Sequence, residues 1–330
     1  MEKTKNINKI KFLHLVDHDG TIFKLVSPLS SFHNHYVLDS FSSSLQSKME
    51  IINKLAQDKN IHCILHATGN KRYFYSIKEN LAKKFKKFYI FLHVSPSHFL
   101  IKDRINELKA IKELTKKFNS KILIPSKELK KEYLYYGLKT IPIQLGIDFK
   151  EDKKREVNRK KFSKKRHIIS VCTAGEGFYS YIKGTDRFYK LIKDLKLEDR
   201  SIILGNNNQL FKGIKTMKVS QRDFFNILNK SEAYIQLSRT EAYNLSAVYA
   251  KRLKIPIIVS NIEGHKDNVR YGFRVNNLSE AKKILREILS NSSSKKIKRI
   301  IEKNYEDSLK RETLNNFKLS LEKLELDKIL

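Results

Sequence analysis

The stretch from Ala233 to Val275 constrains the fold more than any other part of this 330-residue chain. Ala233–Leu237 is an apolar run of strand length, and Ser238–Asn244 is a polar loop that follows it. Ile255–Val259 is a second, mostly β-branched run. Between the two runs, apolar residues recur at helical spacing: Leu245, Val248 and Leu253. This order predicts a βαβ unit, and such units build parallel sheets with helices on their faces.

The polar loop Ser238–Asn244 holds the place where ligands bind in such sheets, at the carboxyl end of a strand and before a helix. Backbone N–H groups at a helix start can hold an anion such as a phosphate. Glu241 repels a phosphate, so its carboxylate is better suited to accept hydrogen bonds from hydroxyl groups, as on a sugar.

Two neighbouring segments resemble one family of enzymes. Ser238–Ala247 resembles the donor-binding segment of retaining glycosyltransferases of family 4, and Ile255–Ser260 resembles the strand that follows it there. Gly264 and Asp267 stand near the glycine and the glutamate of that family. The resemblance implies an α/β, GT-B fold: two Rossmann-like domains facing each other across a cleft, with a C-terminal helix crossing back to the first domain.

A second match sets the expected domain boundaries. The run from Ile124 that ends in Gly146-Ile147-Asp148 resembles the family motif that closes the first domain, and a charge run follows it. The expected parts are an acceptor-side domain, a charged linker, a nucleotide-sugar donor domain and a C-terminal helix. Their bounds are 1–148, 149–166, 167–314 and 315–330.

The resemblance also implies a cationic clamp for the donor's diphosphate. Lys183 and Gly184 match the family's lysine–glycine pair. The family's arginine, six residues earlier, is Gly177 here, and its second glutamate, which grips the ribose, is Tyr249. Arg187 or Arg239 is the candidate substitute for the arginine.

Three residues are the candidate catalytic groups: Lys183, Glu241 and His93. His93 lies at the end of the expected strand Phe88–Val94, where the resembling family often has a histidine that contacts the donor or acceptor. The alternative for His93 is an ordinary core histidine, and His14, His62 and His66 are lesser candidates. The expected donor-binding residues are Gly20, Lys183, Gly184, Arg239, Glu241, Ala242, Tyr243, Asn244, Leu245 and Tyr249.

No metal and no cofactor is expected besides the nucleotide-diphosphate sugar itself. Asp17-His18-Asp19 spells a pattern that other glycosyltransferases use to hold a metal through carboxylate oxygens. A match to a three-residue pattern often occurs by chance, and the resembling family needs no such metal.

The net charge of +32 predicts attraction to polyanions. Ser76–Lys87 is a basic amphipathic segment that fits an anionic membrane surface, with a solvated face over a core stripe as the equal alternative. The charge can also be a compositional habit. No nucleic-acid recognition motif is present. The charged N-terminus lacks a signal-peptide core, and only two cysteines occur, so a cytoplasmic protein, peripheral on the inner face of the membrane, is expected.

The resemblance implies a metal-independent retaining hexosyltransferase, and we expect it to act in surface polysaccharide, teichoic acid, glycolipid or glycoprotein synthesis. Its expected partners are a nucleotide sugar and a glycan, lipid-linked or protein acceptor. The alternative is a catalytically weakened paralogue that serves as the partner subunit of an active glycosyltransferase, because Gly177 and Tyr249 depart from the family pattern. A nucleic-acid-binding protein is a third possibility, and it rests on charge alone.

Overall fold

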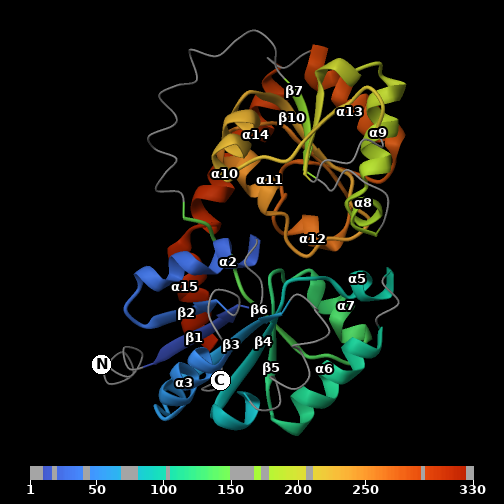
Figure 1. The fold of residues 1–330 in the computed structure, drawn as a ribbon. Coiled ribbons are helices and arrows are strands. Elements are labelled where there is room, and N and C mark those ends of the chain that lie inside the picture. The colour runs from blue at the N-terminus through green and yellow to red at the C-terminus, as the bar shows by residue number, and fades with distance from the viewer. Residues whose placement is uncertain are drawn as a thin grey trace. The chain divides into compact units, whose positions relative to one another are not determined.

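A computed structural model describes residues 10–16, 21–39, 45–67, 81–101, 105–148, 167–171, 178–205, 211–290 and 294–324. The chain divides into two compact units (Figure 1). The first unit comprises Met1–Asp148 with Thr313–Leu330, and the second comprises Phe149–Glu312. The expected linker and the Asp17-His18-Asp19 pattern lie outside the described residues.

The first unit is built on a six-stranded sheet whose strand pairs are all parallel. In sheet order the strands are β2 (His35–Asp39), β1 (Lys11–Val16), β3 (Ile61–Ala67), β4 (Lys87–Leu92), β5 (Lys121–Ile124) and β6 (Thr140–Pro142). The helical elements of this unit are α2 (Thr21–Val26), η1 (Ser27–Ser31), α3 (Leu45–Ala56), α5 (Pro96–Ile101), α6 (Ile105–Lys117) and α7 (Leu129–Tyr135).

The C-terminal helix α15 (Leu314–Glu322) belongs to the first unit, far along the chain from its other elements. Asn34 donates a hydrogen bond from Nδ2 to Glu322 Oε1 over 3.0 Å. The backbone of Gly146 approaches Thr313 so closely that a Cβ on it would lie 1.8 Å from the Thr313 carbonyl oxygen. The glycine of the Gly146–Asp148 motif therefore allows the returning chain to lie against the end of the first domain's main segment.

The second unit contains another six-stranded sheet, also parallel throughout. In sheet order the strands are β12 (Phe273–Val275), β11 (Ile257–Ser260), β10 (Ser231–Gln236), β7 (His167–Val171), β8 (Ser201–Leu204) and β9 (Lys215–Met217). The chain starts at the central β7, winds outward through β8 and β9, and returns to β10 on the other side. This is the Rossmann strand order, and its topological switch point lies between β7 and β10.

Helices cover both faces of this second sheet (Figure 1). They are α8 (Phe178–Lys183), α9 (Thr185–Asp194), η3 (Glu198–Arg200), α10 (Gln221–Asn229), α11 (Leu245–Arg252), α12 (Glu263–Lys266), α13 (Leu278–Ser290) and α14 (Lys295–Arg311). Along β10, Ala233 and Ile235 pack with α9 and α13, whereas Tyr234 packs with α11 on the other face. This alternation follows from the two-residue period of a strand. β10 is therefore packed on both faces, and the loop after it starts from a buried strand.

Candidate functional site

The loop that follows β10 lies at the carboxyl end of a parallel strand and before a helix, as the βαβ pattern predicts. The strand order adds that β10 borders the switch point of the second sheet. Most of its side chains are buried, Ser238, Thr240 and Ala242 among them. Asn244 ends the loop and caps α11: its Oδ1 accepts a hydrogen bond from the Ala247 N–H over 3.0 Å. That N–H is therefore already satisfied, so fewer helix-start N–H groups remain for an anion than the sequence suggested.

The pair Lys183–Gly184 lies against the start of this loop. The Gln236 side chain donates to the Lys183 carbonyl oxygen over 2.7 Å, and the Arg239 N–H donates to the Ile182 carbonyl oxygen over 2.8 Å. Gly184 has a φ of +67°, and a Cβ on it would lie 1.9 Å from the Leu237 carbonyl oxygen. Only glycine fits this contact, which explains why the lysine of the motif is followed by glycine.

These backbone contacts bring two predicted catalytic side chains together. Lys183 Nζ donates a hydrogen bond to Glu241 Oε2 over 2.5 Å. The Lys183 side chain is 34% exposed and that of Glu241 11% exposed. The ammonium and the carboxylate therefore satisfy each other's charge while a part of the lysine side chain stays open to solvent.

A close backbone contact also fixes the other side of Glu241. A Cβ on Gly264, in the short helix α12, would lie 1.8 Å from the Glu241 carbonyl oxygen. Gly264 stands near the family's glycine, so the structure supplies a physical reason for a glycine there. The backbone of Glu241 is thus held against the segment that follows β11.

Arg239 is engaged elsewhere in the second unit. Its guanidinium forms two hydrogen bonds with the Asp186 carboxylate, over 2.7 and 2.6 Å, and lies 3.8 Å from the centre of the Tyr181 ring. The same hydrogen bonds lower the pKa of Asp186 and raise that of Arg239. The bidentate pairing neutralises this arginine, so it is a weaker substitute for the clamp arginine than its position suggested.

Arg187 is the other candidate for the clamp. Burial and the neighbouring Arg239 charge lower its pKa, and Asp186 partly offsets them, so the guanidinium lies close to that pair. Among the described residues no carboxylate lies within ion-pair distance of Arg187. Gly177, the position that replaces the family's arginine, and Gly20, an expected donor-binding residue, both lie outside the described residues.

Tyr249 lies in an aromatic cluster. Its ring meets those of Phe224 and Phe225 from α10 edge to face, with ring centres 6.0 and 4.7 Å apart. The residue is half-buried and packs on the core beneath α11. Where the family places a carboxylate, this protein therefore places an aromatic ring whose body is part of the packing between α10 and α11.

His265 stands in no motif of the sequence, yet it connects the loop after β10 with the end of β11. The ring is fully buried in α12. Its Nδ1 lies 2.9 Å from the Ser260 carbonyl oxygen, and its Nε2 lies 3.2 Å from Asn244 Nδ2. Burial lowers the pKa of His265 to about 4, so the neutral ring donates from Nδ1 and accepts at Nε2. His265 thereby ties the cap of α11 to the end of β11.

A buried ion cluster, also unexpected, lies behind the loop. Lys251 is fully buried on α11, and its Nζ contacts Glu312 Oε1 at 2.7 Å and Asp307 Oδ2 at 3.5 Å. Burial raises the pKa of Glu312 and of the neighbouring Tyr243 hydroxyl. The available signal was that Lys251 follows Val248 by three residues on the buried stripe of the helix. Tyr243 of the loop after β10 therefore lies close to this cluster.

His93 follows β4 in the first unit and is half-buried. Its Nε2 lies 2.9 Å from Nδ1 of His66, so the structure joins it to one of the lesser candidates. His66 in turn contacts His14, and His62 lies on the same strand as His66. Within the described residues no three His, Cys, Asp or Glu side chains are grouped to hold a metal ion.

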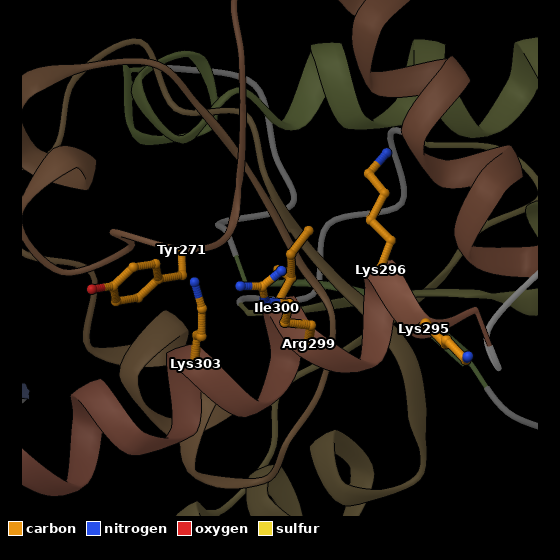
Figure 2. A pocket seen from close by; sticks show the side chains of 6 residues that line it. All are labelled: Tyr271, Lys295, Lys296, Arg299, Ile300 and Lys303. Carbon is orange, nitrogen blue, oxygen red and sulfur yellow. The ribbon is translucent and has the colours of Figure 1, made fainter.

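A basic hollow of about 490 Å³ opens on the surface beside α14 (Figure 2). Tyr271 and Ile300 line it together with four cationic side chains: Lys295, Lys296, Arg299 and Lys303. Lys296 pairs with Glu287 at 3.1 Å, which leaves a net positive hollow. Among the described helices, none is long and apolar enough to cross a membrane.

Comparisons with known proteins support the fold. No protein-family model matches the chain. A putative glycosyltransferase 41 of a Sulfolobus islandicus filamentous virus (isolate Iceland/Hveragerdi) is 25% identical over 126 residues, which is 38% of this chain and 38% of that protein. The match therefore spans well under half of the relative's length.

Two solved structures resemble nearly the whole chain. A glycosyltransferase from Rickettsia africae ESF-5 has a TM-score of 0.64 and 16% identity, over 96% of this chain and 99% of that one. Anabaena Alr3699/HepE, solved in complex with UDP-glucose, has a TM-score of 0.65 and 13% identity, over 95% of this chain and 99% of that one. These likenesses and the two parallel sheets confirm the α/β, GT-B fold that the sequence predicted.

Proposed function

We propose that this protein is a glycosyltransferase that moves a sugar from a nucleotide-diphosphate sugar to an acceptor hydroxyl. The observation that carries the proposal is the contact between Lys183 and Glu241 at the switch point of the second sheet. The GT-B fold and the weak viral relative support it. HepE, which shares the fold, was solved with UDP-glucose, a nucleotide sugar of this class.

The chemistry follows from charge. When the bond between sugar and phosphate breaks, the leaving diphosphate gains negative charge, and a positioned cation stabilises it. Lys183 supplies that cation by exchanging Glu241 for a phosphate oxygen, and Glu241 then accepts hydrogen bonds from the sugar hydroxyls. Arg187 is the second cation of the proposal. The resemblance to family 4 motivates retention at the anomeric carbon, a hexosyl group and independence from metal.

The direct test is to incubate the full chain with a panel of nucleotide sugars and to measure released nucleotide. Release with one donor, and its loss in Lys183→Ala and Glu241→Ala, is expected. Lys190→Ala is the matched control, because Lys190 is an exposed lysine on α9 in the same unit. Equal activity in all three variants would contradict the site assignment.

The alternative is a catalytically weakened partner subunit of an active glycosyltransferase. The observation that favours it is the packing of the Tyr249 ring against Phe224 and Phe225. The family has a ribose-binding carboxylate at this position, whereas the Tyr249 ring is used in packing. A ligand that binds the native state must raise its melting temperature. Copurification with an active homologue, together with no melting-temperature shift from nucleotide diphosphates, would decide for this alternative.

We further propose that the protein binds an anionic membrane surface, where a lipid-linked or glycan acceptor for cell-envelope synthesis would be available. The hollow beside α14 supports this, since its cationic side chains complement anionic headgroups (Figure 2). The predicted basic segment Ser76–Lys87 is described only from Leu81 onward. Cosedimentation with phosphatidylserine vesicles should weaken more in Arg299→Glu than in the control Lys190→Glu. Both variants change the net charge by the same amount. Equal weakening would point to general charge attraction.

A further inference from the structure

Four histidines form a continuous hydrogen-bonded chain on one face of the first unit's sheet. His35, His14 and His66 are buried at 3%, 0% and 0% exposure, and His93 closes the chain. The nitrogen-to-nitrogen distances are 2.9 Å from His35 to His14, 3.0 Å from His14 to His66 and 2.9 Å from His66 to His93. The four rings come from β2, β1, β3 and the residue after β4, which are adjacent in the sheet.

The strand register explains why the rings meet. His35 lies opposite Phe12, two residues before His14, and His14 lies opposite Ile64, two residues before His66. His66 lies opposite Phe91, two residues before His93. Residues two apart share a face, so the chain crosses the sheet diagonally and advances two residues on each strand. It starts at the beginning of β2 and ends at the carboxyl end of β4, the edge where parallel sheets bind ligands.

Every link has the same polarity. Each joins Nδ1 of one ring to Nε2 of the next ring toward His93. A neutral imidazole carries one donor and one acceptor nitrogen. The rings are neutral, because burial lowers the pKa of His35 to about 4 and that of His93 to about 3. If one ring carries its proton on Nδ1, all four rings must carry it on Nδ1. If one ring carries its proton on Nε2, all four must carry it on Nε2.

His35 selects between these two states. Its Nε2 is buried and has no hydrogen-bond partner among the described residues. A buried N–H without a partner is rarer in proteins than an acceptor with a free lone pair. His35 therefore keeps its proton on Nδ1 and donates to His14 Nε2. His14 and His66 follow, and each donates to the next ring.

We propose that His35, His14 and His66 are positioning residues that fix His93 as a neutral ring with its proton on Nδ1. His93 then presents a hydrogen-bond donor at the sheet's carboxyl edge, and it cannot act as a base, because the His66 N–H occupies its other nitrogen. Under the proposed glycosyltransferase function, on which this step rests, the ring takes an oxygen acceptor such as a sugar, carboxylate or phosphate oxygen. The proton that the acceptor hydroxyl loses must then pass to another group, such as the departing phosphate.

Histidine tautomers can be read without any substrate, so this inference can fail independently of the proposed function. The test is a long-range ¹H–¹⁵N correlation spectrum of the full chain labelled with ¹⁵N-histidine, near neutral pH. The four chain histidines should each show a protonated Nδ1 and an unprotonated Nε2. A protonated Nε2, or a doubly protonated ring, at any of the four would overturn the proposal.

Two near-isosteric variants test the direction of control. In His35→Asn the amide can still donate to His14, so the tautomers of His66 and His93 should stay unchanged. In His35→Asp an ionised carboxylate can only accept, so the remaining three rings should switch to protonated Nε2. An unchanged His93 tautomer in a folded, ionised His35→Asp protein would contradict the polarity mechanism. If either variant fails to fold, the wild-type spectrum still decides the assignment.

His62 is the control for assigning the signals, because it lies on β3 with His66 but outside the chain. His62→Gln should remove one histidine signal and leave the four chain tautomers as they are. On the activity side, His93→Asn can still donate a hydrogen bond, whereas His93→Asp cannot. A larger loss of nucleotide release in the second variant supports a donor role, and a larger loss in the first contradicts it.

Discussion

The ammonium of Lys183 lies 2.5 Å from the carboxylate of Glu241, although 58 residues separate the two in the chain. The contact is produced by backbone: Gln236 and Arg239 fasten the end of α8 to the loop after β10. Under the proposed function, a bound donor takes the place of this contact, because its phosphate meets Lys183 and its sugar meets Glu241. Removing either side chain should then affect both the phosphate and the sugar contacts.

Replacement of Lys183 by alanine should lower the rate of sugar transfer on the order of 10²–10³-fold, because one positioned donor to the leaving group is lost. Steady-state release of nucleotide measures this. Lys183→Arg keeps the charge but not the compact ammonium, and it should recover only part of the rate. A rate within a few-fold of wild type in Lys183→Ala would remove this lysine from the mechanism.

Gly184→Ala should unfold or strongly destabilise the second unit, because the new Cβ would lie 1.9 Å from the Leu237 carbonyl oxygen, a backbone atom. Gly213 is the matched control: its φ of +88° is also positive, but its nearest neighbours would be ordinary contacts at 3.4 Å. Gly213→Ala should cost about 1–3 kcal/mol from strain alone. Chemical denaturation of both variants separates the clash from the strain, and equal costs would contradict the close approach.

Lys251→Ala should lower the free energy of unfolding by about 3–5 kcal/mol, because it leaves the buried carboxylate of Glu312 without its cation. Asp307 keeps its pair with Arg311 at 3.5 Å. Lys296→Ala removes an exposed ion pair with Glu287, in which the Lys296 side chain is 65% exposed. This substitution should lower the free energy of unfolding by at most about 1 kcal/mol. Thermal or denaturant unfolding compares the two. Similar costs would mean that the buried cluster contributes little.

The stability of the first unit should fall as pH falls below about 6.5. Histidines of the unfolded chain take up protons there, with a reference pKa of 6.5, whereas His35 stays neutral to about pH 4 and His93 to about pH 3. The unfolded state then binds more protons, so each such ring costs about 1.4 kcal/mol per pH unit within its window. Lys318 and His33 lower the pKa of His35 further, because a second positive charge is disfavoured beside them.

Unfolding measured between pH 6.5 and pH 5 isolates this effect, because most carboxylates titrate at lower pH. His14→Gln should reduce the slope of unfolding free energy against pH by the contribution of one histidine, because burial lowers the pKa of His14 well below its usual value. His33→Gln changes an exposed histidine and should leave most of the slope. A flat profile in the wild type would contradict the neutral chain.

The sequence predicted the fold because its signals are local. The β-branched runs mark the strands, and the loop Ser238–Asn244 stands between a strand and a helix as expected. The region after Ser294 is divided into α14 and α15, which are separated at Glu312 and Thr313. The Thr313 side chain caps α15 by accepting a hydrogen bond from the Asn316 N–H. In the sequence, this single capping threonine is not distinguishable from the helical periodicity on both sides of it.

The candidate site was predictable only in part. Lys183 and Glu241 were found through their motifs, but Asp186, which neutralises Arg239, carries no motif. The link between His14, His35, His66 and His93 depends on strand order and register, which periodicity does not specify. Taken singly in the sequence, each of these histidines resembles an ordinary core residue.

The buried Lys251 has a practical consequence for producing the second unit by itself. Its carboxylate partner Glu312 is the last residue of that unit, immediately before the chain returns to the first. A recombinant fragment that stops at the end of α14 would omit Glu312 and leave an ammonium group enclosed without its closest counter-ion. Truncation for separate expression should therefore run through Glu312, even though the last helical turn ends one residue earlier.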